Sequence, residues 1–215
     1  MKKIAVVLAG NGVYDGAEIH EATLTLLAIA RNGAQYQCFA PDVYQAHVIN
    51  HLTGEEMSEK RNVLVEAARI ARGNIKPLSE YNAKDFNAII FPGGFGAAKN
   101  LCTFAFDGVD CKVNPYVERA VSTTVAEGKP IGALCISPVV ITKILGDVKV
   151  TIGQDEATLQ AIEKLGGKHE KTDHGQIVVD ENYKVVTTPC YMLDATITQI
   201  ADGTENVVRK ILEMV

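Results

Sequence analysis

Short apolar runs rich in β-branched residues alternate along the chain with longer stretches in which apolar residues recur every three or four positions. The short runs are typical of buried strands, and the longer stretches are typical of amphipathic helices. The expected strands cover residues 4–9, 35–40, 88–91, 130–134, 148–152, 177–180 and 184–187. The expected helices cover residues 18–31, 61–72, 115–127, 138–145, 156–165 and 195–214, the last interrupted near Asp202-Gly203.

This alternation predicts an α/β fold, with a mainly parallel sheet of at least five strands and helices on both of its faces. The last two strands flank Glu181-Asn182, which predicts a hairpin-like turn between them. Residues 42–60 are polar and follow neither period, so they are left unassigned. No linker, repeat or low-complexity tract divides the chain, and we expect one domain spanning residues 1–215.

Composition narrows the possible partners. The 215 residues are 47% apolar with a formal net charge of −5. The apolar fraction excludes a disordered chain, and the mild acidity argues against binding to nucleic acid or to an anionic membrane surface. No apolar run approaches the roughly 18 residues of a membrane span.

The first residues and the cysteines bear on location. The apolar run 4–9 follows Lys2 and Lys3 but is too short for a secretory signal, so it is interpreted as the first strand and a cytoplasmic location is expected. The five cysteines are odd in number and lack a Cys-x-x-Cys pair. This usage agrees with a reducing compartment, because it does not resemble a disulfide framework.

One cysteine occupies a position suited to chemistry. The apolar strand that ends at Leu134 is followed directly by Cys135, and Pro138 is placed to begin the next helix. This is the layout of a nucleophile elbow, and the helix N-terminus is expected to favour a thiolate. The alternative is a small buried apolar side chain, which is how most cysteines are used. The other four cysteines are interpreted as structural.

Two further segments fall at predicted strand ends or helix starts, where parallel sheets bind their ligands. The turn Pro92-Gly93-Gly94-Phe95-Gly96 could supply backbone N–H groups to an oxyanion, or could be a plain turn. In the segment Gly16–Glu21, Glu18 is expected to interact with a helix N-terminus. Glu21 could face Cys135 across the sheet, and His20 is left open.

Nucleotide and metal sites receive little support. Gly10, Gly12 and Gly16 do not match the G-x-G-x-x-G dinucleotide pattern. His47 and His51 are four residues apart but lack a metal-binding motif around them, so they are interpreted as solvent-facing or packing residues. We therefore expect no metal and no cofactor.

The three candidate segments, taken together and in this order, resemble the class I glutamine amidotransferase-like superfamily, in its PfpI-like branch of intracellular proteases, glyoxalase III enzymes and protein deglycases. Further segments resemble the bacterial enhancing lycopene biosynthesis family (ElbB, or sigma cross-reacting proteins) over nearly the whole chain. These are Val13–Gly16, Val48–Glu55, Gly93–Leu101 and Val186–Pro189.

The resemblance implies a flavodoxin-like three-layer sandwich and a homodimer. It also implies that Cys135 is a nucleophile, that Glu21 hydrogen-bonds to it, and that the N–H groups of Gly94 and Ile136 are oxyanion donors. The activity implied is that of a glyoxalase, converting glyoxal to glycolate without glutathione, with an indirect link to isoprenoid biosynthesis. The small dicarbonyl is the only partner implied besides the second copy of the chain.

The sequence also departs from better-known relatives. Glutaminases carry Gly-x-Cys-x-Gly-x-Gln and a later His-x-Glu, whereas here Leu134 precedes the cysteine and Ser137 replaces the second glycine, which argues against glutamine hydrolysis. Ile136 stands where many glyoxalase III relatives have histidine, so a base beyond Glu21 is not identified; His169 and His174 are the remaining candidates. A binding, regulatory or redox-sensing protein that retains the pocket is the alternative to an enzyme.

Overall fold

The computed structural model describes all 215 residues, and a seven-stranded sheet lies at its centre. The strand order is β3-β2-β1-β4-β5-β9-β8, and every neighbouring pair is parallel except β8 with β9. The strands are β1 (Lys3–Val7), β2 (Gln35–Ala40), β3 (Ile75–Pro77), β4 (Ala88–Phe91), β5 (Ile131–Leu134), β8 (Val178–Asp180) and β9 (Val185–Thr188). The predicted mainly parallel sheet and the hairpin of the last two strands are confirmed.

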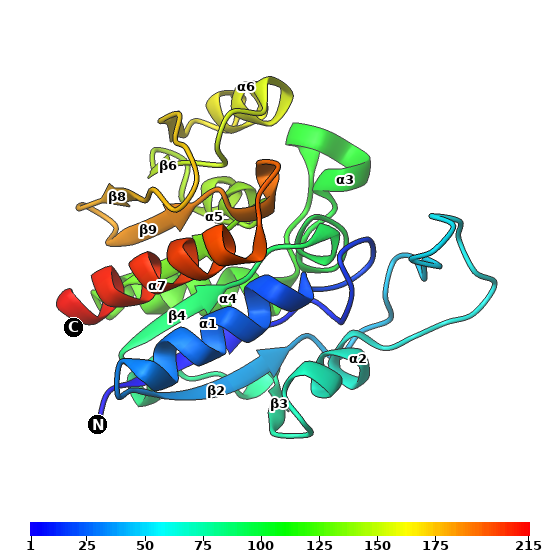
Figure 1. Ribbon diagram of the computed structural model, residues 1–215, viewed down its shortest axis with the longest axis horizontal. Coiled ribbons are helices and arrows are strands. Elements are labelled where there is room, and N and C mark those ends of the chain that lie inside the picture. The colour runs from blue at the N-terminus through cyan, green and yellow to red at the C-terminus, as the bar shows by residue number, and fades with distance from the viewer.

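Helices cover both faces of this sheet, as expected for parallel strands (Figure 1). The helices are α1 (Ile19–Arg31), α2 (Val63–Ile70), α3 (Phe104–Asp107), α4 (Pro115–Ala126), α5 (Pro138–Leu145), α6 (Glu156–Lys164) and α7 (Ile197–Glu213). Helices α1, α2 and α7 share one hydrophobic core with the sheet, and α4, α5 and α6 share the other. The result is the flavodoxin-like three-layer arrangement.

The strand residues alternate between the two cores. In β1, Ile4 and Val6 belong to the core under α1 and α7, whereas Ala5 and Val7 belong to the core under α4 and α5. Because both faces are covered, β1 and β4 consist almost entirely of buried apolar residues. This explains why continuous apolar runs, rather than alternating ones, marked the central strands in the sequence.

Two predicted elements differ from the structure. The strand expected over 148–152 is only β6 (Lys149–Val150), which pairs with β7 (Lys168–His169) in a separate two-stranded sheet. The expected interruption of the last helix is wrong. Helix α7 continues through Gly203, where the absence of a side chain lets it pass close to β9: a Cβ there would lie 3.1 Å from Thr188 Oγ1.

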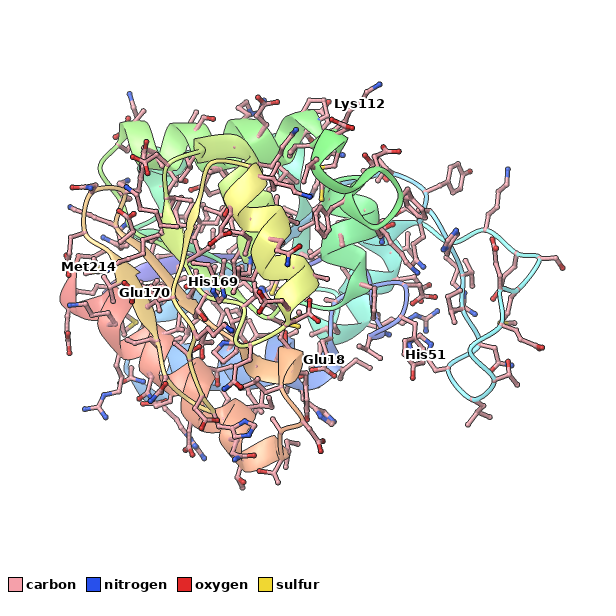
Figure 2. The ribbon with its side chains drawn as sticks, turned by 90° about the horizontal axis from the view of Figure 1, so that it is seen from above. Glu18, His51, Lys112, His169, Glu170 and Met214 are labelled. Carbon is pink, nitrogen blue, oxygen red and sulfur yellow. The ribbon has the colours of Figure 1, made fainter.

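The unassigned segment contains no helix and no extended strand, only isolated bridges such as Ile49 with Glu56. It projects from the body of the molecule (cyan in Figures 1 and 2), with Leu52 97% exposed. None of the helices combines the length and the apolar character that a membrane crossing requires.

Candidate active site

The carboxyl ends of β4, β5 and β9 meet the N-terminus of α1 at one edge of the sheet. Cys135 N–H, just beyond β5, donates to Thr188 O at the end of β9 (3.0 Å). Ser137 Oγ, in the same turn, donates to Pro92 O beyond β4 (2.8 Å). Glu18 N–H, at the start of α1, donates to Gly93 O (2.9 Å). These hydrogen bonds hold four separate segments in a fixed arrangement, in the place where open parallel sheets bind ligands.

Cys135 stands on a sharp turn between β5 and α5. Its φ is 59°, a left-handed conformation that non-glycine residues rarely adopt. Pro138 lies in the first turn of α5, as the sequence predicted. The backbone strain at Cys135 is of the kind found where a fold fixes a reactive side chain, and the turn has the form of a nucleophile elbow.

Glu21 lies in the first turn of α1 and is fully buried beside Cys135. Its carboxyl hydrogen-bonds to the thiol and accepts N–H groups from Gly93 (2.9 Å) and Tyr191 (3.3 Å). Burial, reinforced by the nearby Glu18 carboxylate, raises the pKa of Glu21 to about 8, while these hydrogen bonds lower it less. Glu21 therefore holds its proton near neutral pH and is a hydrogen-bond donor there.

Gly93 makes the Cys135–Glu21 contact possible. A Cβ at this position would overlap Cys135 Cβ and would lie 2.7 Å from Glu21 Oε2 and 3.0 Å from Cys135 Sγ. Only a residue without a side chain can occupy the space between the two groups. The glycine pair after β4 therefore serves close packing of the site and is more than a plain turn.

The N–H groups of Gly94 and Ile136 hydrogen-bond toward the Cys135 sulfur. They lower the pKa of the thiol, but burial and the neighbouring Glu21 raise it more, and the net shift is upward. The expectation of a thiolate favoured at rest is therefore wrong, because the helix-end donors are outweighed by loss of solvent. The two N–H groups are placed to stabilise negative charge that forms at this point during a reaction.

Tyr191, which follows β9, belongs to no motif of the sequence. Tyr191 N–H contacts Glu21, and the Tyr191 hydroxyl hydrogen-bonds to His20 Nδ1 (2.8 Å). Burial and the Glu18 and Glu21 carboxylates raise the pKa of the Tyr191 phenol. The available signal was Thr188-Pro189, since it follows the end of a parallel strand adjacent to β5.

A cavity of about 400 Å³ opens above the Cys135–Glu21 pair. Its wall includes Cys135 and Gly94 at the base. Apolar side chains form most of the remainder, and the polar contributors are Asp155 and Thr158 from α6 together with Tyr191. Cys135 thus faces a space that a small molecule can enter, with Glu21 buried behind it.

The remaining histidine candidates lie elsewhere. His169, in β7, accepts the N–H of Ile152 (3.1 Å), and His174 lines a different groove beside α7. Figure 2 shows His51, which belongs to the projecting segment, far from His169. Neither His169 nor His174 lines the cavity at Cys135, so neither is the missing base. No group of three or more His, Cys, Asp or Glu side chains is placed to hold a metal ion.

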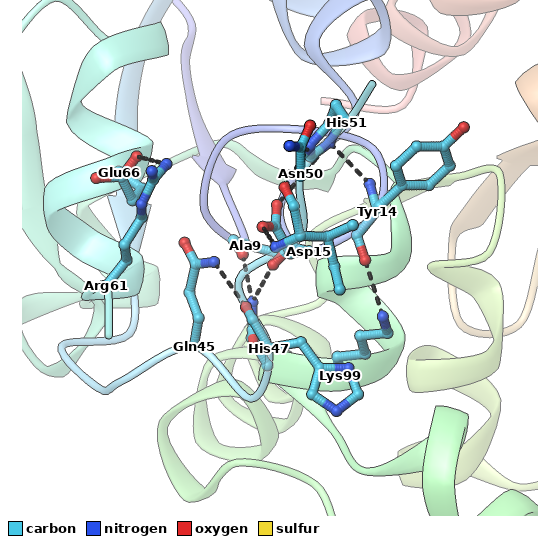
Figure 3. A network of polar contacts seen from close by, with 12 residues as sticks. Ala9, Tyr14, Asp15, Gln45, His47, Asn50, His51, Arg61, Glu66 and Lys99 are labelled. Carbon is cyan, nitrogen blue, oxygen red and sulfur yellow. Dashed lines mark hydrogen bonds and ion pairs between the residues drawn. The ribbon is translucent and has the colours of Figure 1, made fainter. Parts of the chain in front are cut away.

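A polar network joins the projecting segment to the loop that precedes α1 (Figure 3). Asp15 Oδ2 accepts the N–H of Ile49 (2.7 Å), and His51 Nε2 accepts the N–H of Tyr14 (3.2 Å). Asn100 donates to Ala9 O and Asp15 O (2.9 and 2.8 Å). His51 is therefore a packing residue that fixes this loop, and the loop in turn leads into the helix that carries Glu21.

Known proteins are similar in sequence to this chain over nearly its full length, although no protein-family model matches it. Glutamine amidotransferase-like class 1 domain-containing protein 3, mitochondrial, from Homo sapiens is 50% identical over 99% of this chain and 83% of that protein. The ES1 protein homolog, mitochondrial, from Rattus norvegicus is 48% identical over 99% of this chain and 84% of that protein.

Solved structures agree. An isoprenoid biosynthesis protein with an amidotransferase-like domain from Ehrlichia chaffeensis superposes with a TM-score of 0.94 at 35% identity, over 100% of this chain and 99% of that one. Glyoxalase III from Candida albicans superposes with a TM-score of 0.64 at 15% identity, over 99% and 97% of the two chains, and shows the shared fold alone.

The expected cytoplasmic location is contradicted by the human and rat relatives, both of which are named mitochondrial. That expectation rested on the first residues, which form a central strand of the sheet and carry no information about location. The identity to these relatives, extending over almost the whole chain, settles the family. The chain belongs to the family of ES1 and glutamine amidotransferase-like class 1 domain-containing proteins.

Proposed function

We propose that this protein is a glyoxalase-type enzyme of the enhancing lycopene biosynthesis (ElbB) branch, which converts small dicarbonyls to hydroxy acids without glutathione. The observation that carries the proposal is the Cys135–Glu21 pair, in which Cys135 lines a cavity beside two backbone N–H donors and Glu21 is buried next to it. A thiol, an acid–base group with a pKa of about 8 and oxyanion donors are what such a reaction needs.

The first step is attack of the Cys135 sulfur on one aldehyde of glyoxal. The ionised fraction of Glu21 accepts the thiol proton as the C–S bond forms, and the carbonyl oxygen becomes the hydroxyl of a hemithioacetal. The N–H groups of Gly94 and Ile136 stabilise the negative charge on that oxygen while it forms.

Glu21 then moves a proton from the carbon bound to sulfur to the adjacent carbon, which leaves a glycolyl thioester. Water hydrolyses this thioester, releases glycolate and restores the thiol. The net reaction is glyoxal plus water to glycolate, so atoms balance without a cofactor. The backbone N–H of Tyr191 contacts the Glu21 carboxyl, and the Tyr191 hydroxyl is held by His20, so this segment helps to position Glu21.

The test is glyoxal consumption and glycolate formation by the wild type beside Cys135→Ser and Glu21→Gln. We expect both variants to lose turnover, and Glu21→Gln to keep reaction of Cys135 with iodoacetamide, because it retains a donor but cannot accept a proton. Equal turnover in all three proteins would assign the activity to another site or to a contaminant.

The raised pKa of the Cys135 thiol argues against redox sensing, which requires a thiolate. A binding protein is the second candidate, because a protonated thiol is a weak nucleophile. It becomes the better proposal if glyoxal is not consumed. We also propose an indirect role of the glyoxalase-type enzyme in isoprenoid biosynthesis, because the Ehrlichia relative is named an isoprenoid biosynthesis protein.

We further propose a homodimer, as the family resemblance implied. The projecting segment supports this, since Tyr44 and Leu52 are 71% and 97% exposed and a second copy could cover them. Sedimentation at micromolar concentration should give twice the chain mass of 23.2 kDa, and a species of 23.2 kDa would contradict the dimer.

A further inference from the structure

The cavity above Cys135 is much larger than glyoxal requires. Its volume of about 400 Å³ falls within the range of about 300–1,000 Å³ found for pockets that hold drug-sized ligands. Glyoxal has only four non-hydrogen atoms. When its aldehyde reaches the sulfur, most of the cavity is left to water, so the remaining space must be explained by another part of the substrate.

The walls of that space are apolar. Phe95 and Phe104 contribute aromatic rings, and smaller apolar side chains complete the surface. The apolar wall consists of Val13, Phe95, Ala98, Phe104, Ala105, Ile136 and Met192. Phe95 is 50% exposed, and water that covers such a surface is released when an apolar ligand replaces it. The space therefore favours a hydrocarbon group.

The charges around the cavity exclude an acidic substituent. No lysine or arginine lines it, and Asp155 is its one charged lining residue. Hydrogen bonds from Thr158 lower the pKa of Asp155, so the carboxylate stays ionised and caps helix α6. Lys99 lies over the Phe95 ring, but its ammonium donates to Tyr14 O and it is not part of the cavity wall.

We propose that this site takes uncharged 2-oxoaldehydes that carry an apolar side chain of several carbons, and that glyoxal is a poor member of that class. The inference rests on the proposed function and names its substrate class. The aldehyde carbon meets Cys135, the adjacent ketone stays at the polar base, and the side chain extends along Phe95 and Phe104. The product is the corresponding 2-hydroxy acid, formed by addition of one water.

A homologous series of alkylglyoxals, from methylglyoxal to pentylglyoxal, tests this class. The dicarbonyl chemistry is constant along the series, and each step adds only one methylene. We expect kcat/KM to rise by about fourfold per methylene, the change that corresponds to burying one CH₂, until the cavity is filled. An analogue with a terminal carboxylate should be at least about tenfold poorer than its uncharged counterpart.

The variant Ala105→Trp tests the same substrate class by narrowing the cavity. Ala105 is exposed and lines the cavity, so a larger side chain narrows the space without disturbing a core. The ratio of kcat/KM for pentylglyoxal to that for methylglyoxal should fall by at least about tenfold, because the longer side chain needs the space that the indole fills. Ala126→Trp, at an exposed helical position outside the cavity, is the matched control and should leave the ratio unchanged.

The two proposals fail in different ways. A flat or falling series in a wild type that does turn over methylglyoxal through Cys135 would overturn the substrate class and leave the glyoxalase proposal intact. Equal selectivity in the wild type and Ala105→Trp would do the same. If the wild type consumes no member of the series faster than Cys135→Ser, both proposals are wrong.

Discussion

Strands β5 and β9 are neighbours in the sheet, and each is followed by a buried cysteine with a left-handed backbone. Cys135 has φ 59° and Cys190 has φ 44°, and they are 7% and 5% exposed. Burial raises the pKa of both thiols. By strain, burial and acidity the two residues are alike, so none of these properties alone identifies a nucleophile.

The difference lies in what surrounds each sulfur. Cys135 receives backbone N–H groups from Gly94 and Ile136, bonds to Glu21, and faces the cavity. The negative charges of Glu21, Cys135 and Glu18 only raise the pKa of the Cys190 thiol. Cys190 does not line the cavity. A nucleophilic cysteine therefore needs backbone N–H donors, an acid–base partner and access to the cavity at the same sulfur. Backbone strain at the end of a strand indicates only where these three features can occur together.

The largest predicted effect separates the two cysteines directly. Cys135→Ser should lower turnover of methylglyoxal by about a thousandfold or more, because the nucleophile is lost. Cys190→Ser should stay within about threefold of the wild type, since the smaller hydroxyl fits the same space. Initial rates measured on both variants decide the matter, and equal losses would make the two strand ends functionally equivalent.

Compared with the wild type, the Glu21→Gln variant should become more stable to unfolding as the pH rises. The folded pKa of about 8 lies above the usual 4.5, so between these values the unfolded chain has released a proton that the folded chain keeps. Wild-type stability therefore falls by up to about 1.4 kcal/mol per pH unit over this window, and the variant lacks this loss. Urea unfolding at pH 5, 6.5 and 8 measures it. Parallel pH dependences would place the perturbed group elsewhere.

The ionisation of Glu21 should also govern the catalytic rate, but the rate should rise with pH where the stability falls. Because the ionised form of Glu21 accepts the thiol proton, kcat/KM should rise with pH up to about 8 and level above it. The expected rise is roughly fiftyfold between pH 6 and 8, since one proton must leave a group that is half ionised at pH 8. A profile that falls over this range would show that the protonated carboxyl is the active form.

Gly93→Ala tests whether the close packing of Cys135 and Glu21 against Gly93 is required at the end of β5. Its Cβ would overlap Cys135, so we expect unfolding to be easier by about 1–3 kcal/mol and turnover to fall at least about tenfold. Gly203→Ala is the matched control beside β9. There the helical preference for alanine offsets a 3.1 Å contact with Thr188, so little change is expected. Denaturant titration and rates on both variants compare the two ends.

Much of the fold could be predicted from local patterns. The apolar runs at residues 4–9, 88–91 and 130–134 indicated strands because burial on both faces demands continuous apolar sequence. The short strands β3 and β7 could not be found in this way, and β6 is shorter than the strand expected over 148–152. Two or three residues carry no period, and only pairing with a distant strand defines them. Helix α7 was interpreted as broken at Gly203, since the contact that favours glycine lies in β9.

The candidate site divides along the same line. The position of Cys135 between a buried strand and Pro138 is evident from the sequence, because this information is local. The order of its motifs indicated the superfamily. Three features depend on the folded arrangement of distant segments: the contact of Glu21 with Cys135, the space that Gly93 leaves for this contact, and the N–H of Tyr191 on the carboxyl. The protonation of the pair depends on the tertiary structure as well, because a pKa is set by burial and by the charged groups that folding brings together.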